Sequence, residues 1–137
     1  MSFDFHAEPS QADDFIPGAA PAAAQADSGF EKLGLAPEIL KSIRHAGYPA
    51  PTDVQARAVP VALTGADLLV SSQTGSGKTA AFVWPALQRI LTARLDPAKK
   101  RAKGQPSGPR VLVLAPTREL ALQVSRACTQ YGYGVQG

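Results

Sequence analysis

The sequence predicts an α/β fold in which parallel strands alternate with helices. Two apolar runs have the length and composition of buried strands, over residues 67–71 and 110–115. A helical pattern follows each run, over residues 78–93 and from Pro116 to about Gln130. This alternation is typical of a parallel sheet flanked by helices. Because sheets usually have about five or six strands, two strands predict an incomplete domain.

Two more helices are predicted before the first strand. Pro37 suits the first turn of a helix, where its missing N–H is not needed, and Gly47 is a natural stop. Thr52 is the expected N-cap of the second helix. Gln55 stands three residues later, so the pair fits a capping box.

Residues 1–29 differ from the rest of the chain in composition. They hold no Lys or Arg and five of the 11 acidic residues, so residues 30–137 carry all 14 basic residues and a net charge of about +8. The run over 17–27, mostly Pro, Gly and Ala, offers little apolar area, and we predict a disordered tail. An Ala-rich helix is the alternative, which the prolines weaken. The basic remainder, expected to be ordered from near Phe30, suggests a polyanionic partner.

The sequence shows no signal for secretion, for membrane insertion or for a histidine metal site. The single cysteine, Cys128, allows no intramolecular disulfide and is expected to be a small buried side chain in a helix. We find no secretory signal and no apolar run near the ~20 residues that cross a bilayer, which makes a cytoplasmic protein without membrane contact the expectation. His6 and His45 have no metal-ligand partner at suitable spacing.

The strongest chemical signal is a glycine-rich loop between the first predicted strand and the helix after it. Residues 72–79 read Ser-Gln-Thr-Gly-Ser-Gly-Lys-Thr. Gly75 and Gly77 allow backbone N–H groups to turn inward around an anion, and the helix adds its N-terminal partial charge. Lys78 can reach the β- and γ-phosphates of ATP, and the Thr79 hydroxyl can ligate Mg²⁺. The alternative is a Gly-Ser turn followed by a surface lysine.

The whole loop is expected to contact the nucleotide, although one position departs from the generic pattern. That pattern has Gly where Ser72 stands. The expected contacts are Ser72, Gln73, Thr74, Gly75, Ser76, Gly77, Lys78 and Thr79.

Three stretches together resemble the DEAD-box ATP-dependent RNA helicases. The 72–79 loop resembles the family's first motif, in which Ala is usual at the position of Ser72. Residues 47–55 (Gly-Tyr-Pro-Ala-Pro-Thr-Asp-Val-Gln), with Phe30 upstream, resemble the Q motif, which would occupy about 28–56. Residues 116–121 (Pro-Thr-Arg-Glu-Leu-Ala) are similar to motif Ia. The resemblance implies that residues 30–137 are the first portion of a RecA-like domain of the P-loop NTPase class.

The resemblance also implies roles for two residues upstream of the loop. Gln55 would read adenine, because a carboxamide offers the donor and acceptor that match its N6 and N7. Its alternative role is the structural capping box, and one amide can serve both. Phe30 would stack on the base, and the alternative is a core aromatic. Lys78 and Thr79 would be the catalytic residues of this part, with ATP and Mg²⁺ as cofactors.

RNA contacts are implied for motif Ia. Pro116, Thr117 and Arg118 would lie at a helix N-terminus suited to the sugar-phosphate backbone, which predicts binding without sequence specificity. Alternatively, Thr117 only caps the helix while Arg118 pairs with an acid. The basic cluster over 99–103 is interpreted as a solvated loop, with auxiliary attraction of RNA as the alternative.

The family's Asp-Glu-Ala-Asp and Ser-Ala-Thr motifs do not occur in these 137 residues. Their acids would hold Mg²⁺ and position the attacking water. The expectation is an ATP-dependent RNA helicase as the full-length protein, while this chain alone is inactive. The rivals are a nucleotide-binding module that holds ATP without hydrolysis and another P-loop enzyme. Gln55 with Phe30 upstream, together with residues 116–121, argues against the second rival.

Overall fold

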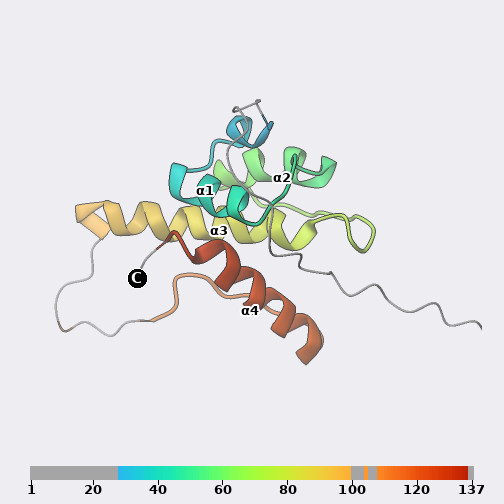
Figure 1. The fold of residues 1–137 in the computed structure, drawn as a ribbon. Coiled ribbons are helices and arrows are strands. Elements are labelled where there is room, and N and C mark those ends of the chain that lie inside the picture. Colours follow the sequence, from blue (N-terminus) through green and yellow to red (C-terminus); the bar gives the residue numbers. More distant parts are fainter. Residues whose placement is uncertain (1–27, 100–103, 105–107, 136–137) are drawn as a thin grey trace, which may run out of the picture.

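A computed structural model describes residues 28–99, 104 and 108–135 of the chain. Its elements in order are η1 (Phe30–Leu33), α1 (Pro37–His45), α2 (Asp53–Leu63), α3 (Lys78–Leu95), η2 (Pro97–Lys99) and α4 (Arg118–Gly132). In the view of Figure 1 the long helix α3 crosses the centre, with α1 and α2 above it and α4 below. Helix α3 packs against both α2 and α4, so it is the central support of the described part.

The ends of α1 and α2 lie where the sequence predicts them. Pro37 occupies the first turn of α1, and Gly47 follows the helix with a φ of 81°, a left-handed conformation that favours glycine. At the start of α2, Gln55 N donates to Thr52 Oγ1 (3.4 Å), and Thr52 N donates to Gln55 Oε1 (3.0 Å). Both bonds of the predicted capping box are therefore present.

The core is centred on Trp84 of α3, whose side chain is completely buried. The ring of Phe30 from η1 meets it edge to face with centroids 5.8 Å apart, and Tyr131 of α4 does the same at 5.5 Å. Burial of aromatic rings gives a large hydrophobic gain, and edge-to-face pairs add to it. One side chain thus joins three elements that are far apart in the sequence.

Helix α4 matches its predicted bounds within a few residues but is less buried than expected. Val124 is buried and Ala127 is packed against the core, whereas Leu120 and Ala121 of the same predicted face are exposed. Cys128 is exposed too, so its predicted burial is wrong. Because only part of the apolar face meets α3 and α1, the flanking positions of α4 remain uncovered.

The predicted strands are not formed. Residues 67–71 and 110–115 have no strand assignment, and the described part of the chain contains helices but no sheet. Leu69 is fully exposed, and Leu112 and Leu114 are 77% and 85% exposed. A strand needs neighbouring strands for its backbone hydrogen bonds, and an isolated pair is marginal in water. Local sequence therefore predicted the apolar character of these runs correctly and their conformation wrongly.

An open groove of about 1280 Å³ lies along α3 where the sheet was expected. Its lining includes Phe82 and Pro85 from α3, Leu68 and Val70 from the first predicted strand, and Arg110 from the second. Leu68 and Val70 of the first run and Val111 of the second therefore line the same space beside α3.

Some sequence predictions concern residues outside the described part. The predicted tail, 1–29, lies outside it except for Ser28 and Gly29, and so do residues 100–103 of the basic cluster. Gly29 has a φ of 83° and precedes η1 as its N-cap.

Candidate functional site

The glycine-rich loop leads directly into α3. Gly75 and Gly77 have φ values of 81° and 85°, and Ser76 N donates to Gln73 O across 3.2 Å. These left-handed glycines let backbone N–H groups converge. Gly77 is the N-cap of α3 and supplies no side-chain cap. The first amides of the helix therefore stay available to an anion, with the helix dipole behind them.

The Lys78 side chain folds back over this loop. Its Nζ donates to the carbonyl oxygen of Ser72 and, at 3.4 Å, to that of Gln73. The residue is only partly exposed. The ammonium group is thus held beside the loop backbone, which differs from the solvated side chain of a surface lysine.

The remaining residues of the loop differ in exposure. Gln73, Thr74 and Gly75 are exposed, whereas Ser72, Ser76 and Thr79 are partly buried. The hydroxyl Oγ of Ser76 is buried and has no hydrogen-bond partner in the described part of the chain. Buried polar atoms are nearly always paired. An orphaned hydroxyl inside a glycine-rich loop fits a polar ligand such as a phosphate.

Gln55 is almost completely buried, with 5% of its surface exposed. Its Oε1 belongs to the capping box, and its Nε2 donates to the carbonyl oxygen of Gly77 across 3.2 Å. The amide therefore bridges the N-cap of α2 and the N-cap of α3. One N–H and one acceptor position of the amide remain for other partners. The bridge to Gly77 was not predicted from the sequence, because a contact between residues 22 positions apart leaves no local pattern.

Phe30 lies in the core, with an exposed fraction of 1%. Its edge-to-face contact with Trp84 covers the ring. A ring that stacks on adenine would present an open face. The arrangement therefore favours the alternative of a core aromatic over the predicted stacking role.

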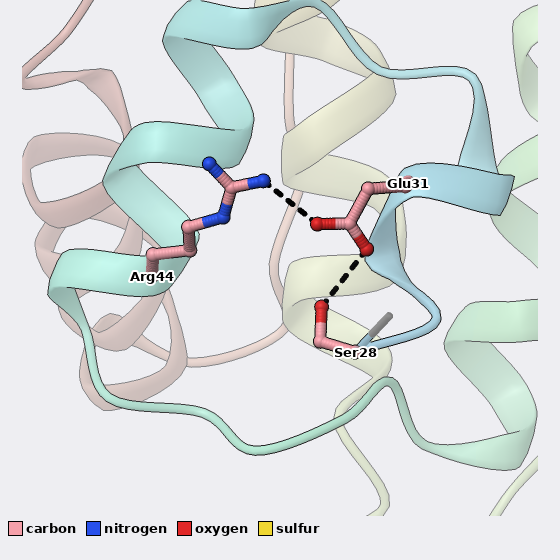
Figure 2. Close-up of polar contacts among 3 residues, drawn as sticks. All are labelled: Ser28, Glu31 and Arg44. Atoms are coloured by element: carbon pink, nitrogen blue, oxygen red, sulfur yellow. Dashed lines mark hydrogen bonds and ion pairs between the residues drawn. The ribbon is translucent and has the colours of Figure 1, made fainter. Parts of the chain in front are cut away.

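Figure 2 shows a polar cluster that attaches η1 to α1. Arg44 donates to Glu31 Oε1 across 2.7 Å, and Ser28 Oγ donates to Glu31 Oε2 across 3.0 Å. The hydrogen bond from Arg44 is the main reason why the pKa of Glu31 falls from 4.5 to about 2. The cluster fixes the element that carries Phe30. The spacing of Ser28 and Glu31 is the only sequence signal that could have indicated it.

The predicted RNA-contact residues lie at the start of α4. Thr117 is the N-cap, and its Oγ1 accepts from Leu120 N across 3.2 Å. Pro116, Thr117 and Arg118 are all exposed. The capping half of the alternative interpretation is therefore present. Its other half is not, because Arg118 forms no ion pair with any residue that the structure describes. The two helix N-termini, of α3 and α4, belong to helices that pack together.

The described residues hold neither a cluster of metal ligands nor a membrane-spanning helix. No group of three or more His, Cys, Asp or Glu side chains among the described residues could hold a metal ion. Within the same residues, no helix has the length and apolar character needed to cross a membrane.

The sequence has relatives among known helicases. SrmB of Haemophilus influenzae, an ATP-dependent RNA helicase, is 49% identical over 98 residues, which are 72% of this chain and 20% of SrmB. The ATP-dependent RNA helicase DeaD of Escherichia coli is 44% identical over 114 residues, which are 83% of this chain and 16% of DeaD. The chain thus spans about a fifth of the length of these relatives.

A solved structure shows the same likeness in three dimensions. The crystal structure of the RNA helicase Prp28 from Chaetomium thermophilum bound to ADP superposes with a TM-score of 0.63 at 35% identity, covering 77% of this chain and 24% of Prp28. A profile of the DEAD/DEAH box helicase family matches residues 52–136, more than half of the chain. This match includes the capping box, the glycine-rich loop and the start of α4, and it shows that the chain belongs to the DEAD/DEAH box helicase family.

Proposed function

We propose that this chain is the ATP-binding part of an ATP-dependent RNA helicase. In the full-length protein, ATP binding and hydrolysis would be coupled to local unwinding of RNA duplexes. The observation that carries the proposal is the loop of residues 72–79, with its left-handed glycines, its folded-back lysine and its orphaned hydroxyl.

The phosphates of ATP would bind at the loop. Backbone N–H groups around Gly75 and Gly77 would surround the β-phosphate, and Lys78 would exchange its carbonyl partners for phosphate oxygens. Mg²⁺ bound with ATP would neutralise charge on the β- and γ-phosphates, and the Thr79 hydroxyl would hold it. Ser76 Oγ would gain the partner that it lacks.

The adenine would bind near Gln55. The amide keeps one donor and one acceptor position after its bonds to Thr52 and Gly77, which is the pair that adenine N7 and N6 require. The same pair does not match guanine, whose O6 and N7 are both acceptors. Gln55 would therefore select ATP over GTP while it holds the loop. Phe30 is not included in this proposal, because its ring is covered.

RNA would bind at the start of α4. The exposed Thr117 and Arg118 stand at a helix N-terminus, where a phosphate group meets backbone N–H groups and a guanidinium. Such contacts read no bases, so binding would be independent of sequence.

The isolated chain should bind ATP without hydrolysing it. Phosphoryl transfer needs groups that position water and neutralise developing charge. The Asp-Glu-Ala-Asp sequence that would supply them in this family does not occur in the 137 residues. A module that binds nucleotide without hydrolysis is therefore the second candidate function, and this absence favours it for the chain alone.

Equilibrium dialysis with radiolabelled ATP and Mg²⁺, followed by a phosphate-release assay with and without RNA, tests the proposal. Wild-type chain should bind ATP, Lys78→Ala should bind it much more weakly, and neither should release phosphate above background. Arg57→Gln is the matched control, since Arg57 is an exposed cation of α2 that pairs with Asp53 on the same helix. Equal ATP binding by wild type and Lys78→Ala would refute the phosphate site, and RNA-stimulated phosphate release would refute the predicted inactivity.

A further inference from the structure

Helix α4 has two faces of different character. Val124 and Tyr131 are buried against the rest of the described chain. The opposite face carries Arg118, Leu122, Arg126 and Thr129, and it is continued by Tyr133, the C-cap residue directly after the helix; all five are exposed. These five residues recur every three or four positions, the spacing of a single helix face. We call them the outer stripe of α4.

The outer stripe combines positive charge with exposed apolar surface. Leu122 is 47% exposed and Tyr133 is 84% exposed, an unusually open position for an aromatic ring. Neither Arg118 nor Arg126 forms an ion pair with a described residue. The stripe contains no acid, and Glu119 beside it is the single acid of α4. The stripe therefore presents unneutralised guanidinium groups and an open ring.

We propose that the outer stripe of α4 continues the RNA-binding surface from Arg118 along the helix, with single-stranded RNA as its occupant. Arg118 and Arg126 would contact phosphates, and Tyr133 would stack on a base. This inference rests on the proposed RNA contact at Thr117 and Arg118, and extends it to residues outside motif Ia.

Three arguments favour RNA over a protein partner. The stripe begins at the proposed phosphate contact, so the two surfaces are continuous. Arg118 and Arg126 are eight positions apart, or about 12 Å along a helix at 1.5 Å per residue, a span suited to successive contacts along one strand. Aromatic rings combined with basic side chains are the usual means of binding single strands without sequence preference.

The charge of the chain agrees with such an occupant. All 14 basic residues and only six of the 11 acidic ones fall within residues 30–137. A polyanion would be attracted to this part of the chain as a whole, whereas the outer stripe specifies where along α4 it would lie.

The salt dependence of RNA binding tests the role of Arg126. A short fluorescein-labelled oligouridylate is titrated with the chain at several salt concentrations, and anisotropy gives Kd. Each phosphate contact to a single strand contributes about 0.7 to the slope of log Kd against log salt. Arg126→Gln should therefore weaken binding several-fold at low salt and reduce the slope by about 0.7. Arg57→Gln, which removes an exposed guanidinium from α2, should leave that slope unchanged.

Tyr133 gives an independent readout, because stacking releases no counterions. Tyr133→Ser should weaken binding without a change in the salt slope, and Tyr133→Phe should bind as wild type does. Circular dichroism confirms that each variant keeps its helix content. If wild type binds RNA while Arg126→Gln and Tyr133→Ser bind equally well, this inference is wrong and the proposed contact at Thr117 and Arg118 stands. If wild type does not bind RNA at all, both are overturned.

Discussion

The side-chain amide of Gln55 donates to the carbonyl oxygen of Gly77 across 3.2 Å. The same amide closes the capping box with Thr52. Since Thr52 is the N-cap of α2 and Gly77 is the N-cap of α3, one buried side chain connects the starts of both helices. The conformation of the glycine-rich loop therefore depends on a residue 22 positions upstream.

A pair of glycine substitutions separates backbone strain from this contact. Gly75 and Gly77 have nearly equal positive φ values, but a Cβ at Gly75 would meet nothing within 4 Å, whereas a Cβ at Gly77 would overlap Gln55 Nε2 and lie 3.1 Å from Thr52 Oγ1. Gly75→Ala should lower the free energy of unfolding by about 1 kcal/mol. Gly77→Ala should lower it by about 2–4 kcal/mol, because overpacking is added.

Urea denaturation followed by circular dichroism measures both glycine variants. In a Gln55→Ala background most of the difference between them should disappear, since the crowded amide is gone. Equal destabilisation of the two variants in the wild-type background would contradict the close approach of Gln55 to Gly77.

Substitution of Gln55 should lower the free energy of unfolding by more than loss of the cap alone. Thr52→Ala removes one capping bond and should lower the free energy of unfolding by about 1 kcal/mol. Gln55→Ala removes the reciprocal bond and also leaves Gly77 O without its partner, so about 2–3 kcal/mol is expected. Thermal and urea unfolding of both variants test this ranking. A Gln55→Ala chain as stable as Thr52→Ala would mean that the bond to Gly77 contributes nothing.

The ion pair of Glu31 and Arg44 predicts a particular dependence of stability on pH. The pKa of Glu31 is about 2 in the folded chain, against an ordinary 4.5, mainly through its hydrogen bond from Arg44. A lowered carboxyl pKa stabilises the fold above the unfolded pKa, and the contribution is lost as the pH falls from about 4.5 to about 2. Because both side chains are substantially exposed, the effect should be small and weakened by salt.

Unfolding of wild type and Glu31→Gln between pH 7 and pH 2 checks this dependence. Wild type should be the more stable protein at pH 7, and the two curves should converge as the pH approaches the folded pKa of about 2. A difference that is the same at both ends of the range would indicate that the carboxylate charge is not involved.

Substitutions of Trp84 test how much the aromatic core stabilises the fold. Its ring contacts Phe30 and Tyr131, yet its indole Nε1 is buried without a hydrogen-bond partner among the described residues. Trp84→Ala should lower the free energy of unfolding by about 3–5 kcal/mol, because it leaves a cavity in the core. Trp84→Phe should lower the free energy of unfolding clearly less than Trp84→Ala does, because it keeps an aromatic ring and loses no hydrogen bond. A Trp84→Phe variant as unstable as Trp84→Ala in urea denaturation would contradict the stabilising role of an aromatic ring at this position.

Local sequence predicted the helices of this chain well. Pro37, Gly47 and the pair of Thr52 and Gln55 act on their immediate neighbours, so their effects can be inferred from the sequence alone. Gly75 is similar, because a positive φ depends on the residue itself. For the same reason the position of the glycine-rich loop at the start of α3 was predicted.

Features that depend on residues far away in the chain were either not predicted from the sequence or predicted wrongly. The runs at 67–71 and 110–115 have the composition of strands, but a strand also needs neighbours to supply hydrogen bonds. Cys128 lies on α4 four positions after the buried Val124, but its side chain is exposed, because burial depends on what packs against each position. The bond from Gln55 to Gly77 and the ion pair of Glu31 and Arg44 also join residues far apart in the chain.

The most direct test of the account is nucleotide-dependent thermal stability of the wild-type chain. A ligand at about 100 times its Kd stabilises the folded state by about 2.7 kcal/mol. ATP with Mg²⁺ should therefore raise the Tm of wild type and of the Arg57→Gln control, GTP should raise it far less, and ATP should not raise the Tm of Lys78→Ala. Equal shifts with ATP and GTP would contradict the role of Gln55, and an equal ATP shift in Lys78→Ala would contradict the phosphate site itself.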